Sequence, residues 1–269
     1  MSHASFHEFG GFFAEHGITD QRYLADNYRR FCSTKDRLES TRRKNGQRLL
    51  DVGAHWLHQS LLYARDGYAV TAADFPATFR EPAVQSLARA NGIELVEYTS
   101  LDSPTAFLHI PDSCFDIVLF TEIIEHITFN PVAMWKELYR LLREGGIIVV
   151  TTPNYYYVHG RFWDWKRLIQ GRGGGITVDE VLCRCTYGHH WKEYSLRELH
   201  QYFRTLSPDF VVEKGLYVDD YFDPEGRRYQ GTRWAWLTDC FPALRPNLHI
   251  EVSLPHKERG IVVSPSWRG

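Results

Sequence analysis

Residues 114–154 read CFDIVLFTEIIEHITFNPVAMWKELYRLLREGGIIVVTTPN, and their pattern gives the clearest indication of the fold. Its first apolar run, residues 115–120, is rich in β-forming side chains and predicts a buried strand. A segment with apolar side chains at helical spacing follows and predicts a helix that ends at the glycine pair 145–146. Residues 147–150 predict a second buried strand. A strand, a helix and a strand in this order are typical of a parallel sheet.

Polar side chains follow the first of these strands directly. They are Thr121, Glu122, Glu125 and His126. In open α/β sheets, ligands bind at the carboxyl ends of the strands. We therefore expect these four side chains to lie at a functional site.

The alternation of strands and helices continues on both sides of this unit. Expected strands cover residues 47–53, 68–73, 93–98 and 210–218, and expected helices cover residues 60–64, 83–90 and 195–206. Residues 248–254 alternate between apolar and polar side chains, which predicts an edge strand. The expected fold class is therefore α/β, with a mostly parallel sheet and helices on both faces.

Three segments are expected along the chain. Residues 1–46 form an N-terminal helical arm or lid, in which one helix carries its apolar side chains on one side. Residues 47–218 form the main domain, and residues 155–188 are an aromatic helical insertion over its active face. Residues 219–269 form a C-terminal segment that carries the expected edge strand.

The composition excludes several classes of protein. The chain has 269 residues, is 43% hydrophobic and has a net charge of −2, so it can bury a core and has no overall attraction for nucleic acid. Cys183 and Cys185 have no second pair nearby, which argues against zinc and favours reduced thiols in the cytoplasm. We expect no signal peptide and no membrane span, and the aromatic content predicts a homodimer interface.

An acidic residue and a glycine end the first expected strand, and a second acid ends the next one. Asp51 and Gly53 lie in the sequence LLDVGA, and Asp74 follows about twenty residues later. A glycine at this point lets a ligand approach the backbone, and an acid on the second strand can bind two ribose hydroxyls. The G-x-G-x-x-G pattern of nicotinamide-binding proteins is absent.

Several segments together resemble the class I S-adenosylmethionine-dependent methyltransferases. They read LLDVGA, VTAADFP, FDIVLFTEIIEHI, LYRLLREGGIIVVTTPN and HHWKEYSLREL, and they extend over roughly residues 47–215. The resemblance implies a Rossmann-like, seven-stranded sheet whose last strand is antiparallel. It also implies that the cofactor is S-adenosyl-L-methionine.

The resemblance implies a role for each cofactor-binding residue. The expected set is Asp51, Gly53, Ala54, Asp74, Phe75, Asp102 and Thr121. The Gly53 loop would contact the methionine part, Asp74 would bind the ribose hydroxyls, and Asp102 would lie near the adenine. Asp51 would order the loop or bind the amino group. The chain departs from the family at two loop glycines, where it has His55 and Leu57.

A second group of residues can bind a metal or a proton. Glu122, Glu125 and His126 have the spacing of one helical turn, and His189 and His190 follow the insertion. Carboxylates and neutral imidazoles suit Mg²⁺, Mn²⁺, Fe²⁺ or Zn²⁺.

The pattern resembles the metal-dependent 2′-O-methyltransferases that act on the 3′ end of small RNAs. In that family the positions of Glu122, Glu125, His126 and His190 would bind a divalent cation such as Mg²⁺, Mn²⁺ or Fe²⁺. Similar motifs also occur in methyltransferases that act on sugars and other small molecules. There the histidines are a general base or have a structural role.

We expect methyl transfer to a small-molecule acceptor, namely a hydroxyl of a sugar, glycan or natural product. The expected catalytic residues are His126, His190 and Glu122, and either a histidine or a metal promotes loss of the hydroxyl proton. Two alternatives remain. One is a metal-dependent RNA 2′-O-methyltransferase, against which the near-neutral charge argues. The other is a non-catalytic, cofactor-binding regulatory protein, which the altered glycine loop suggests.

Overall fold

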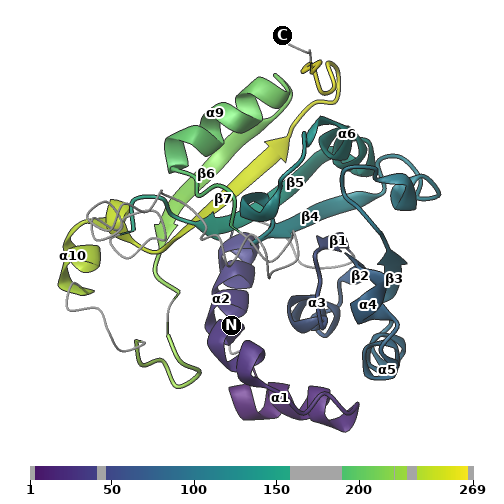
Figure 1. Ribbon diagram of the computed structural model, residues 1–269, viewed down its shortest axis with the longest axis vertical. Coiled ribbons are helices and arrows are strands. Elements are labelled where there is room, and N and C mark those ends of the chain that lie inside the picture. Colours follow the sequence, from purple (N-terminus) through teal and green to yellow (C-terminus); the bar gives the residue numbers. More distant parts are fainter. Residues whose placement is uncertain (1–3, 41–46, 158–189, 221, 229–234, 266–269) are drawn as a thin grey trace, which may run out of the picture.

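The computed structural model describes residues 4–40, 47–157, 190–220, 222–228 and 235–265. One seven-stranded sheet lies at its centre, in the order β3-β2-β1-β4-β5-β7-β6 (Figure 1). The strands are β1 (Arg48–Val52), β2 (Ala69–Asp74), β3 (Glu94–Glu97), β4 (Phe115–Thr121), β5 (Leu142–Pro153), β6 (Val211–Val218) and β7 (Asn247–Leu254). Strands β1 to β5 run parallel, and β7 is antiparallel to both of its neighbours. The expected seven-stranded sheet with an antiparallel last strand is confirmed.

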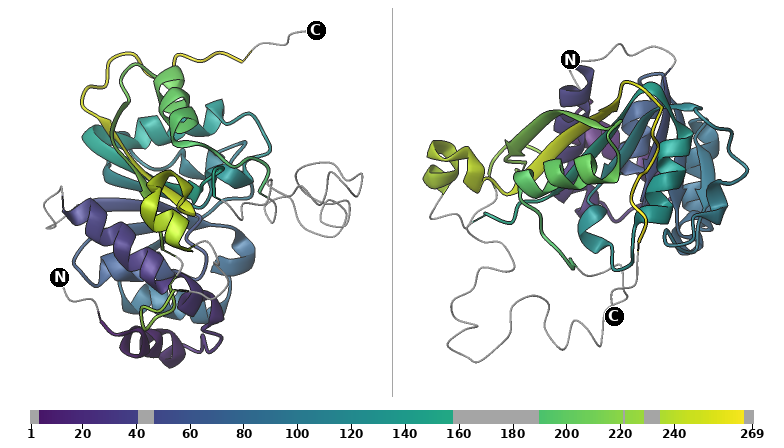
Figure 2. Two further views of the ribbon diagram at one scale, coloured as in Figure 1. Left: turned by 90° about the vertical axis from the view of Figure 1, so that its left-hand side faces the viewer. Right: turned by 90° about the horizontal axis from the view of Figure 1, so that it is seen from above.

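Helices cover both faces of the sheet (Figure 2). One face carries α1 (Phe6–Glu15), α2 (Arg22–Glu39), α3 (His58–Ala64), α4 (Pro76–Phe79) and α5 (Pro82–Ala90), and the other carries α6 (Val132–Leu141) and α9 (Leu196–Leu206). A further helix, α10 (Ala235–Cys240), lies at the margin, and 3-10 turns cover Thr105–Phe107, Ile124–His126 and Pro242–Leu244. The expected Rossmann-like α/β class is confirmed. Among the described residues, no helix has both the length and the apolarity needed to cross a membrane.

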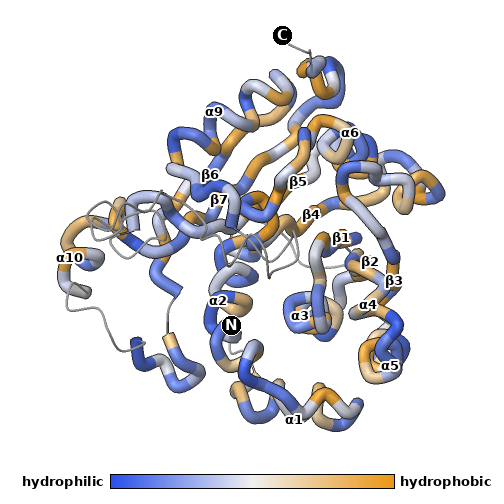
Figure 3. The backbone as a smooth tube through the Cα atoms, in the orientation of Figure 1, coloured by the Kyte–Doolittle hydropathy of each residue, from blue (hydrophilic) through white to orange (hydrophobic). Residues whose placement is uncertain are grey.

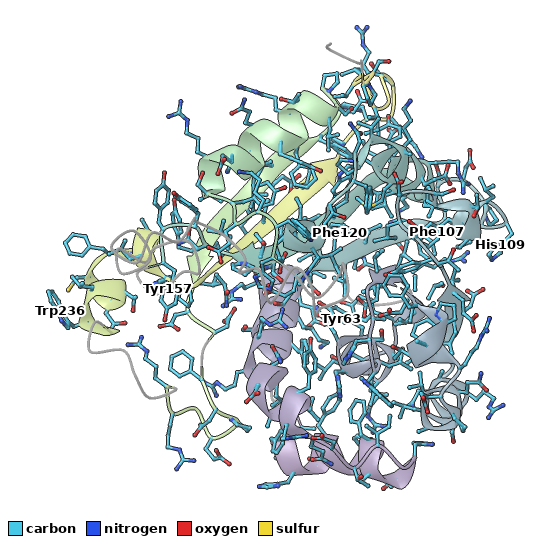
Figure 4. The ribbon with its side chains drawn as sticks, in the orientation of Figure 1. Tyr63, Phe107, His109, Phe120, Tyr157 and Trp236 are labelled. Carbon is cyan, nitrogen blue, oxygen red and sulfur yellow. The ribbon has the colours of Figure 1, made fainter. Side chains whose placement is uncertain are left out.

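The core consists of two clusters of buried side chains, one on each face of the sheet. Phe120 of β4 belongs to the cluster under α6 and α9, and Tyr63 of α3 belongs to the other. Both lie in the interior, whereas Trp236 and His109 lie at opposite margins of the molecule (Figure 4). Apolar segments concentrate in the strands, and hydrophilic segments lie on the outer helices (Figure 3). This pattern explains why the strand sequences read as continuous apolar runs.

The transition from α6 to β5 differs from the expectation. The helix ends at Leu141 rather than at the glycine pair 145–146, because Leu142 already pairs with Phe115 on β4. Pairing between β5 and β4 then resumes only at Ile147, so the residues between Leu142 and Ile147 interrupt the regular pairing of these two strands. Gly145 has φ of +75°, a left-handed conformation that glycine adopts without strain.

The expectation of an edge strand at residues 248–254 is wrong. β7 lies between β5 and β6, and all of its residues are buried. Its alternating polar side chains do not face solvent, because His249 and Glu251 form a buried hydrogen bond of 3.1 Å. Lys214 of β6 binds Glu251 and also donates to the carbonyl of Arg37 on α2. A buried polar network therefore produces the alternation that exposed strands usually show.

The N-terminal segment is packed and helical. Phe9 and Phe13 of α1 and Leu24 of α2 are buried in the cluster on that face of the sheet. The lid function expected of residues 1–46 stays a prediction. Residues 158–189, which include most of the expected aromatic insertion and the cysteine pair, lie outside the described residues.

The loop after β1 keeps a left-handed backbone although it lacks two family glycines. Gly53, His55 and Leu57 have φ values of 75°, 49° and 66°. For a residue with a side chain this conformation costs about 1–2 kcal/mol. Two contacts offset that cost: the His55 amide donates to the Asp74 carboxylate, and the Leu57 side chain is fully buried.

A buried carboxyl group lies near the end of β1. The Ser60 hydroxyl donates a hydrogen bond of 2.6 Å to Asp51, whose side chain is almost fully buried. Burial raises the pKa of Asp51 to about 7, and the negative charge of Asp74 adds to the rise, while the Ser60 hydrogen bond opposes it.

We predict that Asp51→Asn stabilises the protein more at pH 8 than at pH 5. The unfolded carboxyl ionises near pH 3.8 and the folded one near 7, so the folded state holds an extra proton between these values and loses stability as the pH rises. The difference between pH 5 and pH 8 should be about 2–3 kcal/mol. Urea denaturation at both pH values measures it, with the exposed Asp102→Asn as control. An equal effect of Asp51→Asn on the free energy of unfolding at both pH values would show that folding does not raise the pKa of Asp51.

Candidate active site

A cavity of about 220 Å³ lies at the carboxyl edge of the sheet. Gly53, Asp74 and Thr121 line it from the ends of β1, β2 and β4. Tyr23 of α2 and His55 lie on its wall as well. This is the edge at which the sequence predicts a ligand site, and four of the expected cofactor-binding residues, Phe75 included, line the cavity there.

The carboxylate of Asp74 is held in place by backbone amides. One oxygen accepts from the amide of His55 and the other accepts from the amide of Phe75, at 2.6 Å. Burial raises the pKa of Asp74, and the two amide hydrogen bonds oppose the rise. The carboxylate therefore lines the cavity in a fixed orientation, as recognition of two vicinal hydroxyls requires.

One wall of the cavity is apolar and aromatic. Phe75 and Tyr98 pack edge to face with ring centroids 4.8 Å apart, and Leu101 lies beside them. Asp102, expected near the adenine, is exposed and does not line the cavity; Leu101 takes that position. An apolar wall next to a fixed carboxylate suits a nucleoside, with the base on the wall and the ribose on Asp74.

Position 53 accommodates only glycine without strain. A Cβ atom at this position would lie 2.2 Å from Cδ1 of Ile123, and φ is +75°. A smaller hollow of about 30 Å³ adjoins the cavity behind Gly53, and Asp51 and Ala54 line it. The residues present therefore fit S-adenosylmethionine: a carboxylate for the ribose, an apolar wall for the base and a polar hollow beside the glycine loop.

Three of the four expected metal-binding residues form a cluster. In the described part of the chain, ligand atoms of Glu125, His126 and His190 lie within 4.8 Å of one another. The two imidazole rings are perpendicular, with centroids 4.6 Å apart. The Glu125 carbonyl accepts a 2.7 Å hydrogen bond from the amide of Trp191, which brings the chain after the insertion to this point.

Glu125 carries the most unusual carboxylate of the cluster. Its side chain is fully buried; Oε2 accepts from the Thr152 hydroxyl at 2.9 Å, whereas Oε1 has no hydrogen-bond partner within the described part of the chain. Nε2 of His126 lies 3.8 Å from that second oxygen. Burial, together with the charge of Glu122, raises the pKa of Glu125 well above its ordinary value. This carboxyl group therefore needs either a proton or a bound cation.

Glu122 lies apart from this cluster, contrary to the expectation of one shared helical face. Ile124–His126 is a 3-10 turn that begins after Glu122, and Glu122 itself has φ of +55°. The hydroxyls of Thr151 and Thr152 hold Glu122 and Glu125 respectively. Glu122 instead pairs with Arg30 of α2 at 3.2 Å.

Several lining residues were missed by the sequence analysis. Tyr23 appeared only as an apolar helix residue, and Arg30 had no local signal because its partner lies on a distant strand. His55 could have been found, because it replaces a family glycine in a loop that contacts the ligand. Tyr98 follows β3 and carried no motif.

Comparisons with known proteins agree with the fold. A family model described as a methyltransferase domain matches residues 50–150. None of the curated proteins compared with this sequence matches it.

Solved structures share the fold at low sequence identity. One chain belongs to the Haloferax volcanii complex between the Trm112 methyltransferase activator and a protein described as a methyltransferase. It is 16% identical, with a TM-score of 0.58, covering 95% of this chain and all of that one. Haemonchus contortus phosphoethanolamine N-methyltransferase 2, solved with S-adenosyl-L-methionine, is 14% identical with a TM-score of 0.55, covering 92% of this chain and 60% of that one. A Thermotoga maritima methyltransferase is 15% identical with a TM-score of 0.52, and the match covers 91% of this chain and 99% of that one.

The family match covers β1 through most of β5, which supply the strand ends around the cavity. The topology, the glycine loop and the carboxylate on β2 point to the same family. Residues 50–150 thus match a methyltransferase domain, and the seven-stranded sheet with its antiparallel β7 has the class I S-adenosylmethionine-dependent methyltransferase fold that the sequence resemblance implies.

Proposed function

We propose that the protein methylates a hydroxyl group of a sugar, glycan or natural product. The observation that carries the proposal is the position of His126, which lines the cofactor cavity and also belongs to the cluster with Glu125 and His190. A group that can remove a proton thus lies beside the space for the methyl donor. Hydroxyl acceptors need such a group because they are weak nucleophiles at neutral pH.

The chain's own residues position the cofactor. Asp74 binds the ribose hydroxyls, Phe75 and Tyr98 hold the base, and the Gly53 loop lies along the amino-acid end. When bound, S-adenosylmethionine supplies an electrophilic methyl group. Because methyl transfer is an in-line displacement, the cavity's main task is to align the acceptor oxygen with that methyl.

Two routes for the acceptor proton use the same cluster. In the first, His126 accepts the proton and Glu125 stabilises the charged imidazole that forms, since its unpaired oxygen lies 3.8 Å away. In the second, Glu125, His126 and His190 would hold a divalent cation such as Mg²⁺, Mn²⁺ or Fe²⁺, which would lower the pKa of the hydroxyl. The second route would also satisfy the buried oxygen of Glu125.

The RNA alternative is weaker than this proposal. It requires four metal ligands, and among the described residues only Glu125, His126 and His190 bring their ligand atoms together. The net charge of −2 gives no general attraction for a polyanion. The regulatory alternative rested on the altered glycine loop, and that loop keeps the left-handed backbone at His55 and Leu57.

We predict that Gly53→Ala weakens binding of S-adenosylhomocysteine about tenfold or more. The added methyl would displace Ile123 into the cavity and strain the backbone, at a cost of about 1–2 kcal/mol. Titration calorimetry measures the affinity. The matched control is Gly11→Ala on α1, where a Cβ meets nothing within 4 Å. Unchanged affinity in Gly53→Ala would place the cofactor elsewhere. The double variant with Ile123→Ala should recover part of the loss.

We predict that His126→Gln lowers O-methyl transfer by about 10²- to 10⁴-fold and leaves cofactor affinity unchanged. Purified protein is incubated with S-adenosylmethionine and panels of sugars, natural products, amines and a short RNA, and S-adenosylhomocysteine release and the site of methylation are measured. His109→Gln, an exposed histidine at the margin of the molecule, is the control (Figure 4).

The same assay separates the two routes and can reject the proposal. Loss of activity on chelation, with stoichiometric metal lost in Glu125→Gln, would select the cation route. Chelator-resistant activity would select the histidine route. Methylation confined to nitrogen or to RNA would contradict the hydroxyl assignment.

A further inference from the structure

The small hollow beside the cofactor cavity has an unusual charge pattern. It shares Tyr23, Gly53 and Thr121 with the larger cavity, so the two spaces adjoin. Asp51 is the one carboxyl group and Arg30 the one arginine or lysine among the described residues that line the hollow, beside the imidazoles of His55 and His58. Side chains of opposite charge around a small space suit a ligand group that carries both charges itself, such as the amino-acid end of a small molecule.

Arg30 is buried and supplies the fixed positive charge that the described residues bring to the site. Among the described residues that line the two spaces, no other lysine or arginine occurs, whereas Asp51, Asp74 and Glu122 contribute carboxyl groups. Its Nη1 lies 3.2 Å from Oε1 of Glu122, and its Nη2 donates to Asn27 at 2.8 Å. The Tyr23 hydroxyl is a further hydrogen-bond partner of Arg30. Guanidinium groups bind carboxylates most strongly through two parallel hydrogen bonds, so a single contact to Glu122 is weaker than such a pair.

We infer that Arg30 binds the carboxylate of the cofactor's amino-acid end and exchanges its contact with Glu122 for this one when the cofactor binds. The inference rests on the proposed use of the cavity for S-adenosylmethionine. The glycine loop fixes where the amino-acid end lies, and the hollow that holds Arg30 adjoins that loop. Asp51, on the same hollow, faces the ammonium group of the same end.

The loss of the Arg30 contact would also change the environment of Glu122 near the acceptor. Glu122 lines the larger cavity together with His126. Once Arg30 binds the cofactor, the Glu122 carboxylate is released toward that cavity, where it can accept a hydrogen bond from the acceptor. Cofactor binding therefore prepares the site for the acceptor. A purely structural Arg30 would instead keep its contact with Glu122 in both states.

The test compares two ligands that differ at the amino-acid end. S-adenosylhomocysteine carries the carboxylate, and 5′-methylthioadenosine has the same nucleoside and sulfur without it. Calorimetry measures both affinities for the wild type, Glu122→Gln, Arg30→Met and the double variant. The double variant removes both charges, so neither is left buried without its partner. Arg29→Met, the exposed neighbour on α2, is the control.

Arg30→Met, made alone or together with Glu122→Gln, should weaken the binding of S-adenosylhomocysteine by about tenfold or more. It should change the affinity for methylthioadenosine by less than about twofold. Glu122→Gln should strengthen S-adenosylhomocysteine several-fold, because the competing carboxylate is gone. Equal effects of Arg30→Met on both ligands, or none on either, would overturn the role of Arg30. Unchanged or weaker S-adenosylhomocysteine binding in Glu122→Gln would overturn the exchange. If the wild type binds neither ligand, the cofactor assignment itself fails, and the inference fails with it.

Discussion

The ion pair between Arg30 and Glu122 joins the N-terminal helices to the end of β4. Its importance follows from a constraint on the whole site: the carboxyl ends of β1, β2 and β4 bring Asp51, Asp74, Glu122 and Glu125 close together. Three of these side chains are buried. Burial and mutual repulsion raise the pKa values of Asp51 and Glu125. A site of this kind is stable only with protons, hydrogen-bond donors or cations to compensate.

Each carboxyl group meets this constraint in a different way. Asp51 retains a proton up to about neutral pH and accepts from Ser60. Asp74 accepts hydrogen bonds from two backbone amides, and the one from His55 ties the glycine loop to this carboxylate. Glu122 has Arg30, and Glu125 has Thr152, with one oxygen left for a proton or a cation. Asp51 and Asp74 therefore lie on the side of the cavity that we assign to the cofactor, and Glu122 and Glu125 lie on the side that we assign to the acceptor.

Much of the sheet could be predicted from the sequence because its strands are buried on both faces and read as apolar runs, as residues 115–120 do. The position of β7 could not be predicted, since His249 and Glu251 form a buried pair that looks like an exposed strand face in sequence. Asp74 and Gly53 could be placed because strand ends share one edge.

Other parts of the site depended on contacts that have no local pattern. Glu122 was expected to share a helical face with Glu125, but the backbone turns at Glu122, and the two acids accept hydrogen bonds from two different threonines. Arg30 was missed because its partner is distant in the sequence. Spacing predicted which residues reach the site, and packing decided which of them act together.

A crystal structure with S-adenosylhomocysteine would show whether the cavity binds the cofactor with its sulfur toward the His126 cluster. We expect the adenine on Phe75 and Tyr98, the ribose on Asp74 and the sulfur facing His126. A ligand bound outside this cavity, or one whose sulfur faces away from His126, would rule out this mode of cofactor binding.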